Sequence, residues 1–237
     1  MPAYSSHAFA EKVALVTDGE NPVGRAVALQ LALLGCYVIV GFSNAGEENK
    51  RALQELQSLG TLANTVESDI SIIEGAKALV AEVEKMFGRL DLLINTLKFR
   101  SDSTFEQTIE DVWQKTVDAN LKSAFFVTQA ALDLMKPRPK PVIVNIGYGK
   151  ETETNIAFAV AQSGLIGFTK SLAEMLAPKF RVNCVVISED SKKPVENLDA
   201  ELFRVKTGVS EDDAARAVVY LLSSEAIGLN GQVLTVG

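Results

Sequence analysis

The regular alternation of short apolar runs with helix-like segments constrains the fold of this chain more than any other feature. The apolar runs have the length of buried strands, and the segments between them show the apolar spacing of helices. Strands are predicted at 12–17, 37–42, 61–70, 90–95, 141–146, 181–187 and 231–236. Helices are predicted at 22–35, from about 50 to 60, at 108–136 and at 155–177. A further helix follows the third strand and runs through residue 86. Strands that are apolar throughout and alternate with helices indicate a parallel sheet covered on both faces.

These elements predict one α/β domain over residues 1–237, a doubly wound, Rossmann-like sheet of about seven strands with helices on both faces. We expect residues 1–10 to be a flexible tail. The net charge of −7 leaves no basic patch, which argues against a nucleic-acid binder. No apolar run reaches the roughly 18 residues of a membrane span. The N-terminus lacks the apolar core of a signal peptide, so a cytoplasmic location is expected.

The cysteines and the single histidine exclude two further classes of site. Cys36 precedes one predicted strand and Cys184 lies in another, and these strands are predicted to lie four places apart in the sheet, roughly 19 Å, which is too far for a disulfide. Two buried free thiols are expected instead. His7 is the only histidine and lies in the predicted tail. A zinc site or a histidine-based triad is therefore not expected, and no metal site is predicted.

The segment 143–173 reads IVNIGYGKETETNIAFAVAQSGLIGFTKSLA, and Asn120 lies in VDANLKSAFF. Together with RVNCVV at 181–186 and the C-terminal GQVL, these motifs resemble the short-chain dehydrogenase/reductase family, in particular its 3-oxoacyl-[acyl-carrier-protein] reductases. The resemblance covers essentially the whole chain. It implies a dinucleotide-binding fold, an NAD(P)-dependent oxidoreductase activity, and a catalytic set of Asn, Ser, Tyr and Lys.

The resemblance retains only one of these four catalytic residues. Asn120 matches the family Asn, whereas Tyr148, Phe158 and Gln162 stand at the positions of the Ser, the Tyr and the Lys. Phe158 has no proton to transfer, and general acid catalysis is worth about 10²–10⁴-fold. We expect the aromatic residues at 148 and 158 to fill the pocket as packing. A rearranged acid pair of Tyr148 with Lys150 or Lys98 stays open as an alternative.

The turn at 17–26, TDGENPVGRA, follows the first strand, where the family has Thr-Gly-x-x-x-Gly-x-Gly against the cofactor pyrophosphate. Thr17 and Gly24 match this pattern, and Gly19 offers some turn flexibility. Asp18 would cost on the order of 3 kcal/mol against each phosphate charge about 5 Å away. Pro22 has no N–H to donate, although it suits the first position of a helix.

The remaining cofactor positions are mixed. No acid follows the second strand, where Ser43 stands, which leans toward NADP over NAD. Asp69 and Ile70 match the family pair that contacts the adenine, although Asp69 also suits a strand-end turn. Asn95 is retained, but Leu97 and Lys98 put bulk beside the cofactor site. We therefore expect NADP to bind weakly or not at all.

Two functions from different classes follow. The first is a non-catalytic homologue, a pseudoenzyme that works as a structural or regulatory subunit. The resemblance implies a homo-oligomer, a dimer or tetramer built through the helices at 108–136 and 155–177 and the last strand, or a mixed oligomer with an active paralogue. The second is an NADP(H)-dependent reductase of a 3-oxoacyl thioester or similar carbonyl that uses unconventional residues.

Overall fold

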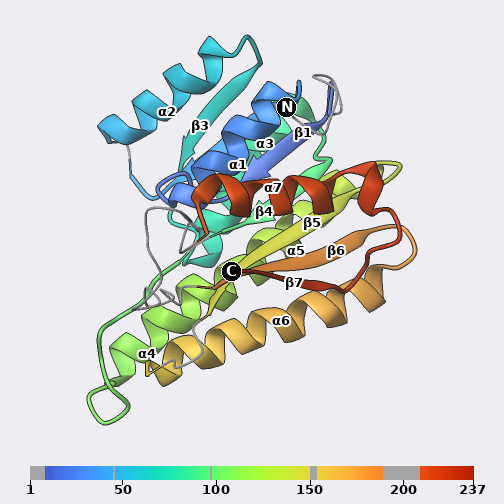
Figure 1. The fold of residues 1–237 in the computed structure, drawn as a ribbon. Coiled ribbons are helices and arrows are strands. Elements are labelled where there is room, and N and C mark those ends of the chain that lie inside the picture. The colour runs from blue at the N-terminus through green and yellow to red at the C-terminus, as the bar shows by residue number, and fades with distance from the viewer. Residues whose placement is uncertain (1–8, 45, 97, 150–153, 189–208) are drawn as a thin grey trace, which may run out of the picture.

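The computed structural model describes residues 9–44, 46–96, 98–149, 154–188 and 209–237. Seven parallel strands in these ranges form one sheet in the order β3-β2-β1-β4-β5-β6-β7 (Figure 1). The strands are β1 (Val13–Val16), β2 (Tyr37–Phe42), β3 (Ala63–Glu67), β4 (Leu92–Asn95), β5 (Val142–Gly149), β6 (Arg181–Ser188) and β7 (Val233–Val236). The predicted Rossmann-like sheet is confirmed.

Helices cover both faces of the sheet, and each face has its own hydrophobic cluster. The helices are α1 (Pro22–Leu33), α2 (Glu47–Ser58), α3 (Ile73–Phe87), α4 (Glu110–Val117), α5 (Ser123–Met135), α6 (Ile156–Leu176) and α7 (Glu211–Leu222). Residues of α1, α2 and α7 pack on one face. Residues of α3, α5 and α6 pack on the other. This two-sided cover explains why central strands such as β1 and β4 are buried along their whole length.

Three features depart from the sequence expectations. The predicted helix at 108–136 consists of α4 and α5 joined by a π-helical turn, η1 (Asp118–Lys122), which contains Asn120. Helix α7 was not predicted; a short 3₁₀ turn, η2 (Ser224–Ala226), follows it. Phe9, placed in the expected tail, is fully buried in a hydrophobic cluster of the fold, so this residue is not part of a flexible tail.

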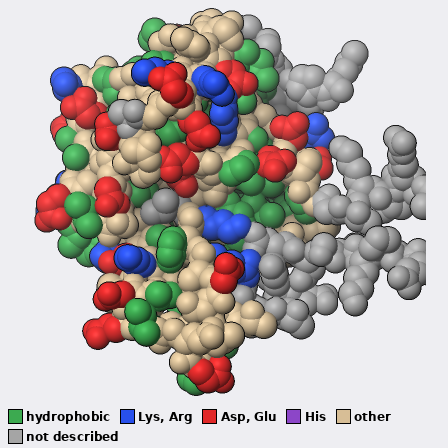
Figure 2. All heavy atoms as spheres, turned by 90° about the vertical axis from the view of Figure 1, so that its left-hand side faces the viewer, with side chains coloured by type: hydrophobic (Ala, Val, Ile, Leu, Met, Phe, Trp, Pro, Cys, Tyr) green, Lys and Arg blue, Asp and Glu red, His purple; other side chains and the backbone are tan. Residues whose placement is uncertain are grey.

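The order of the strands determines where a ligand can bind. The chain builds β1, β2 and β3 outward in one direction and β4 to β7 in the other, so the winding reverses between β1 and β4. In such sheets ligands bind at the carboxyl ends of the strands beside this reversal. The strands point left in Figure 1, so Figure 2 views their carboxyl ends, where acidic and hydrophobic side chains share the surface.

The remaining fold-level expectations concern the cysteines and membrane spans. Cys36 and Cys184 are both buried and free, as predicted. Burial raises the pKa of the Cys184 thiol to about 12. Within the described ranges, α6 alone is long and apolar enough by composition to cross a bilayer. It lies against β5 and β6 as a covering helix of the sheet. No group of three or more potential metal ligands occurs in the described part of the chain.

Candidate functional site

The turn between β1 and α1 is built from short side chains that bond to nearby backbone. Thr17 Oγ1 accepts a hydrogen bond of 3.0 Å from the backbone N–H of Thr96, which ties the ends of β1 and β4 together. Asp18 Oδ1 accepts from the N–H groups of Glu20 and Asn21, at 2.9 and 3.2 Å. Asn21 is then the N-cap of α1. Local hydrogen bonding of Asx side chains therefore sets the shape of this turn.

Asp18 is almost fully buried in the turn. Burial raises the pKa of its carboxyl to about 6, while the N–H groups of Glu20 and Asn21 lower it and the charge of Glu20 raises it further. Gly24 cannot carry a side chain, because a Cβ there would lie 2.1 Å from the Asp18 carbonyl oxygen. Gly19 is similarly constrained by the ring of Phe42, 2.4 Å from such a Cβ. Both glycines therefore serve close packing.

Tyr148 reaches from β5 to the N-terminus of α1. Its hydroxyl lies 2.7 Å from Asn21 Nδ2 and 2.9 Å from Asn21 Oδ1, and the side chain is buried. Since β4 lies between β1 and β5, the side chain crosses the carboxyl end of β4. Asn21 Nδ2 also donates to the Thr96 carbonyl there, at 3.2 Å. Tyr148 thus spans the crevice in which sheets of this type bind a ligand.

Gln162, at the position of the family Lys, connects Tyr148 to the π-helical turn. Its Oε1 accepts from the backbone N–H of Tyr148 at 2.9 Å, and its Nε2 donates to Asn120 Oδ1 at 3.2 Å. Asn120 Nδ2 donates in turn to the carbonyls of Thr116, at 2.8 Å, and of Phe99, at 2.6 Å. The amide groups of both side chains are therefore engaged with other parts of the chain, which makes Gln162 and Asn120 structural links.

The aromatic side chains at the family Ser and Tyr positions are each covered by a cation. Lys98 Nζ lies 4.3 Å from the ring centroid of Tyr148, and the Arg100 guanidinium lies 4.5 Å from that of Phe158. Phe158 is 1% exposed. Lys98 contacts the face of the Tyr148 ring, whereas the Tyr148 hydroxyl bonds to Asn21. This arrangement disfavours the alternative acid pair of Tyr148 with Lys98. Lys150 lies outside the described residues.

Residues 98–101, which we call the covering segment, contact two of the altered positions, Tyr148 and Phe158. Besides the two cations, Phe99 bonds through its backbone N–H and carbonyl to the side chain of Asn120. Ser101 accepts from Asn155 Nδ2 through its carbonyl and its hydroxyl, at 2.7 and 2.8 Å. Asn155 is also the N-cap of α6. The covering segment therefore joins β4 to the start of α6 across the catalytic positions.

At the end of β2, Ser43 and Asn44 bind a carboxylate of the protein itself. Glu20 Oε1 accepts from the Ser43 N–H at 3.2 Å, the Ser43 hydroxyl at 2.7 Å and Asn44 Nδ2 at 3.2 Å. An open depression of about 240 Å³ lies beside these bonds. Its lining includes Glu20, Glu47 and Glu48, so this end of the sheet is acidic.

The other positions expected to contact a cofactor have bonds within the protein. Asp69 Oδ1 accepts from the N–H and hydroxyl of Ser71, at 3.0 and 2.6 Å, so it forms a strand-end turn. Ile70 belongs to the hydrophobic cluster. Asn95 Nδ2 donates to Asn145 Oδ1 at 2.8 Å and links β4 to β5. Asn95 Oδ1 is a buried acceptor with no hydrogen-bond partner among the described residues.

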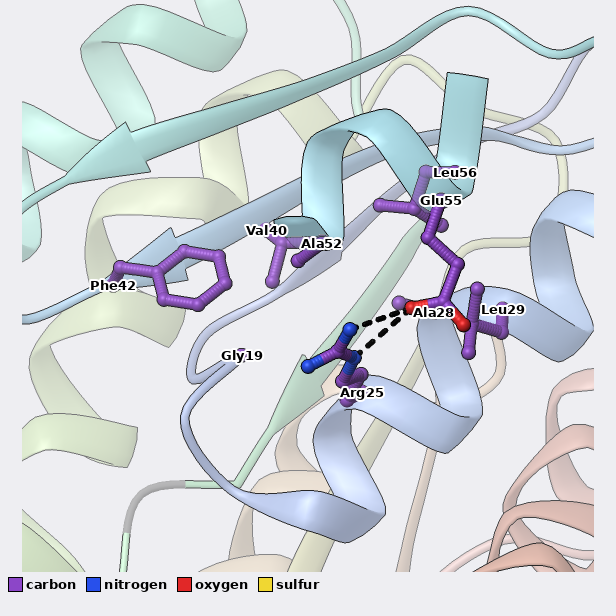
Figure 3. A pocket seen from close by; sticks show the side chains of 9 residues that line it. All are labelled: Gly19, Arg25, Ala28, Leu29, Val40, Phe42, Ala52, Glu55 and Leu56. Atoms are coloured by element: carbon purple, nitrogen blue, oxygen red, sulfur yellow. Dashed lines mark hydrogen bonds and ion pairs between the residues drawn. The ribbon is translucent and has the colours of Figure 1, made fainter. Parts of the chain in front are cut away.

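A small cavity adjoins the turn between α1, β2 and α2 (Figure 3). Its volume is about 10 Å³, at the lower limit for a single water molecule. Arg25, the basic residue nearest Gly24, points to Glu55 across the cavity, with Nη2 2.6 Å from Oε2. Arg25 is thus paired with a carboxylate, and the cavity is too small for an organic ligand.

Sequence reasoning placed Lys98 beside the cofactor site but did not identify Glu20, Asn21 or residues 99–101 as part of the site. The spacing of Asp18 and Asn21 is typical of an Asx turn followed by a helix N-cap, so Asn21 had a readable local signal. Glu20 had none, because its partners on β2 are brought near only by the sheet. The residues present do not fit a dinucleotide in this arrangement, since Tyr148 and Glu20 engage the groups that would receive it.

Comparison with known proteins places the chain among oxidoreductases. A sequence model described as short chain dehydrogenase matches residues 12–189. The chain is 29% identical to short-chain dehydrogenase/reductase FrzI of Cladobotryum sp over 81% of this chain and 77% of that protein. It is 28% identical to 3-oxoacyl-[acyl-carrier-protein] reductase FabG of Staphylococcus aureus, over 95% and 96%. The solved structure of an actinorhodin polyketide ketoreductase variant with NADPH matches at a TM-score of 0.83, 26% identity and 95% coverage of both chains.

Proposed function

The chain belongs to the short-chain dehydrogenase family, and from this premise we propose that it is a non-catalytic member, a structural or regulatory subunit. The observation that carries the proposal is Phe158 at the position of the family acid, 1% exposed and stacked under the Arg100 guanidinium. A phenyl ring has no proton to give to a developing alkoxide. No hydride transfer to a carbonyl is completed without that proton.

The groups around Phe158 do not replace the missing acid. Gln162 has no charge to lower the pKa of a neighbouring phenol, and its amide bonds to the Tyr148 backbone and to Asn120. The Tyr148 hydroxyl is bound to Asn21 on the far side of β4. Asn120 is retained, but its amide bonds to Phe99, Thr116 and Gln162. The altered positions have thus become links that hold the fold together.

Assembly is the activity that remains for such a subunit. Apolar side chains on α5 and α6 are exposed, with Phe125 at 44% and Val160 at 46%. Exposed apolar surface of this kind is typical of a subunit interface. We propose a homodimer or homotetramer through these helices, or a mixed oligomer with an active paralogue. Neither form requires a working acid.

The test is a reductase assay with an active 3-oxoacyl reductase as positive control. The purified protein, at micromolar concentration, is mixed with NADPH or NADH and an acetoacetyl thioester, and cofactor oxidation is followed by absorbance. We expect no rate above that of the thioester and cofactor alone. A turnover of about 1–10³ per second, typical of enzymes, would overturn the proposal. It would favour instead an NADP(H)-dependent reductase with unconventional residues.

A further inference from the structure

We infer that Tyr148 and Glu20 are internal ligands, which occupy the two ends of the nucleotide cleft and exclude a dinucleotide from it. The inference rests on the proposed non-catalytic function and names the device that closes the site. It concerns two places: the N-terminus of α1, where sheets of this type receive a pyrophosphate, and the end of β2, where they receive the adenosine ribose.

At the N-terminus of α1, the backbone donors of the first turn are already used. A helix N-terminus binds phosphate through N–H groups that have no partner within the helix. Here Pro22 has no N–H. Asn21 Oδ1 accepts from the N–H groups of Val23 and Gly24, at 3.0 and 3.4 Å, and the Asn21 carbonyl accepts from Arg25 at 2.9 Å.

Tyr148 completes the closure at this end. Its hydroxyl bonds to the same Asn21 side chain, and its ring fills the crevice above the end of β4. The side chain is 5% exposed and lies under Lys98. A pyrophosphate would therefore have to displace a buried aromatic side chain and the N-cap bonds of α1 together. This end of the cleft is closed by a buried side chain.

At the end of β2, the closure is exchangeable. Three donors from Ser43 and Asn44 converge on the single oxygen Glu20 Oε1, as they would on an oxygen of a 2′-phosphate. Glu20 is exposed, so its carboxylate can leave without opening the core. While it stays, its charge repels a phosphate. Glu20 and Asn21 are consecutive residues whose N–H groups both bond to Asp18, so one turn positions Glu20 and the Asn21 side chain that bonds to Tyr148.

The experiment measures nucleotide binding by calorimetry, without any need for activity. The probes are adenosine 2′,5′-bisphosphate, AMP and NADP. The variants are Glu20→Ala, Tyr148→Ser, their combination, and Glu48→Ala as the matched control. Glu48 lines the same depression and carries the same charge, but the Ser43 and Asn44 donors contact Glu20. Tyr148→Phe, which removes only the hydroxyl, accompanies Tyr148→Ser in case the larger truncation fails to fold.

We expect Glu20→Ala to raise the affinity for adenosine 2′,5′-bisphosphate by at least about tenfold, the scale of one removed like charge. The affinity of Glu20→Ala for AMP should rise less. Glu48→Ala should change the affinity for either probe by less than about threefold. NADP should gain most in the combined variant. Tyr148→Phe should leave NADP binding weak, because the ring still fills the crevice.

The outcomes separate this inference from the function on which it rests. If the unmodified protein binds NADP with a dissociation constant in the low micromolar range, the closed cleft fails, whereas the proposed function is decided separately by the reductase assay. If the unmodified protein binds no nucleotide and Glu20→Ala gains nothing over Glu48→Ala, the inference about Glu20 is overturned and the proposed function stands. A folded Tyr148→Phe variant that binds NADP with a dissociation constant in the low micromolar range would show that the ring does not block the crevice.

Discussion

Asp18 is the residue on which the turn depends most, and its chemistry makes the turn sensitive to pH. Its side chain is almost fully buried and accepts hydrogen bonds from the backbone N–H groups of Glu20 and Asn21. Burial raises the pKa of Asp18 to about 6 from the ordinary 3.8. Because the folded-state pKa is the higher one, the stabilising contribution of Asp18 is fully present below about pH 4. It is lost as the pH rises through about 6.

Replacing this carboxyl with an amide should therefore stabilise the protein at neutral pH. Asp18→Asn keeps an oxygen for the turn and removes the buried charge, so unfolding at pH 7.5 should cost up to about 3 kcal/mol more than in the unmodified protein. The two proteins should be equally stable near pH 4. Urea unfolding at several pH values measures the difference. A variant that is less stable at pH 7.5 would show that the carboxylate form holds the turn.

At the scale of single residues, the sequence predicted identities better than contacts. The altered positions at 148, 158 and 162 could be recognised from their neighbours along the chain, because the family motif lies within one continuous segment, 143–173. The bond between Tyr148 and Asn21 could not, since it joins residues 127 positions apart. It depends on the placement of β1 and β5 on either side of β4, and on the rotamer of the Tyr148 side chain. The bonds from Ser43 and Asn44 to Glu20 depend likewise on the pairing of β1 with β2.

Among the secondary-structure elements, α7 is fixed at its C-terminus by one residue of the sheet. The guanidinium of Arg181, on β6, donates to the carbonyls of Leu221, Leu222, Ser223 and Ala226 at 2.6 to 3.4 Å. Such carbonyls have no partner within the helix, and a cation there also compensates the helix dipole. Desolvation by burial lowers the pKa of Arg181. The hydrogen bonds to four carbonyl acceptors offset this desolvation of the Arg181 guanidinium.

Removing the guanidinium should destabilise the protein without unfolding it. For Arg181→Met we expect a loss of about 2–4 kcal/mol, because buried carbonyls lose a charged partner. Arg181→Lys should lose less but not recover fully, since one ammonium cannot serve the same fork of acceptors. Arg216→Met is the matched control on α7, because Arg216 is exposed and its guanidinium pairs with the Asp213 carboxylate of the same helix. Urea unfolding at fixed protein concentration is the measurement. Equal losses at 181 and 216 would contradict this role.

The sequence predicted the order of elements well and their irregularities poorly. Apolar runs identified the central strands because β1, β4 and β5 are buried on both faces. The apolar pattern left α7 unassigned, although Ser210 and Asp213 form an N-terminal cap whose spacing was readable. The π-helical turn at Asp118–Lys122 had no local signal, because an extra residue per turn leaves composition unchanged. That turn presents Asn120 to Gln162, so the irregularity matters to the site.

For the whole molecule, the feature that bears on assembly is the exposed face of α6. On α6 the exposed positions include Ile156, Val160, Ser163 and Gly167, which follow one another at helical spacing. A Cβ at Gly167 would meet no atom within 4 Å, so this stripe is open to another helix. Phe125 on α5 lies beside it through Phe168, with ring centroids 5.5 Å apart. Large and small residues together permit close helix packing.

We therefore expect a dimer or tetramer whose interface is centred on this stripe. Light scattering after size exclusion should give at least twice the chain mass of 25.5 kDa at micromolar concentration. Val160→Glu should lower the mass to that of one chain, because a charge would be buried between apolar helices. Leu33→Glu, at an apolar position on α1 that is more exposed than Val160, should leave the mass unchanged.

A monomer in the unmodified protein would contradict self-assembly, and the next measurement then decides between the two forms of the proposed subunit. The same chain is mixed with an active paralogue, and the mass is measured again. A gain in mass that Val160→Glu abolishes and Leu33→Glu preserves would assign the stripe to a mixed oligomer. An interface of this obligate kind buries about 2,000 Å² or more. A chain that stays monomeric in both experiments would leave its exposed apolar helices without an assembly role, and the subunit proposal would fail.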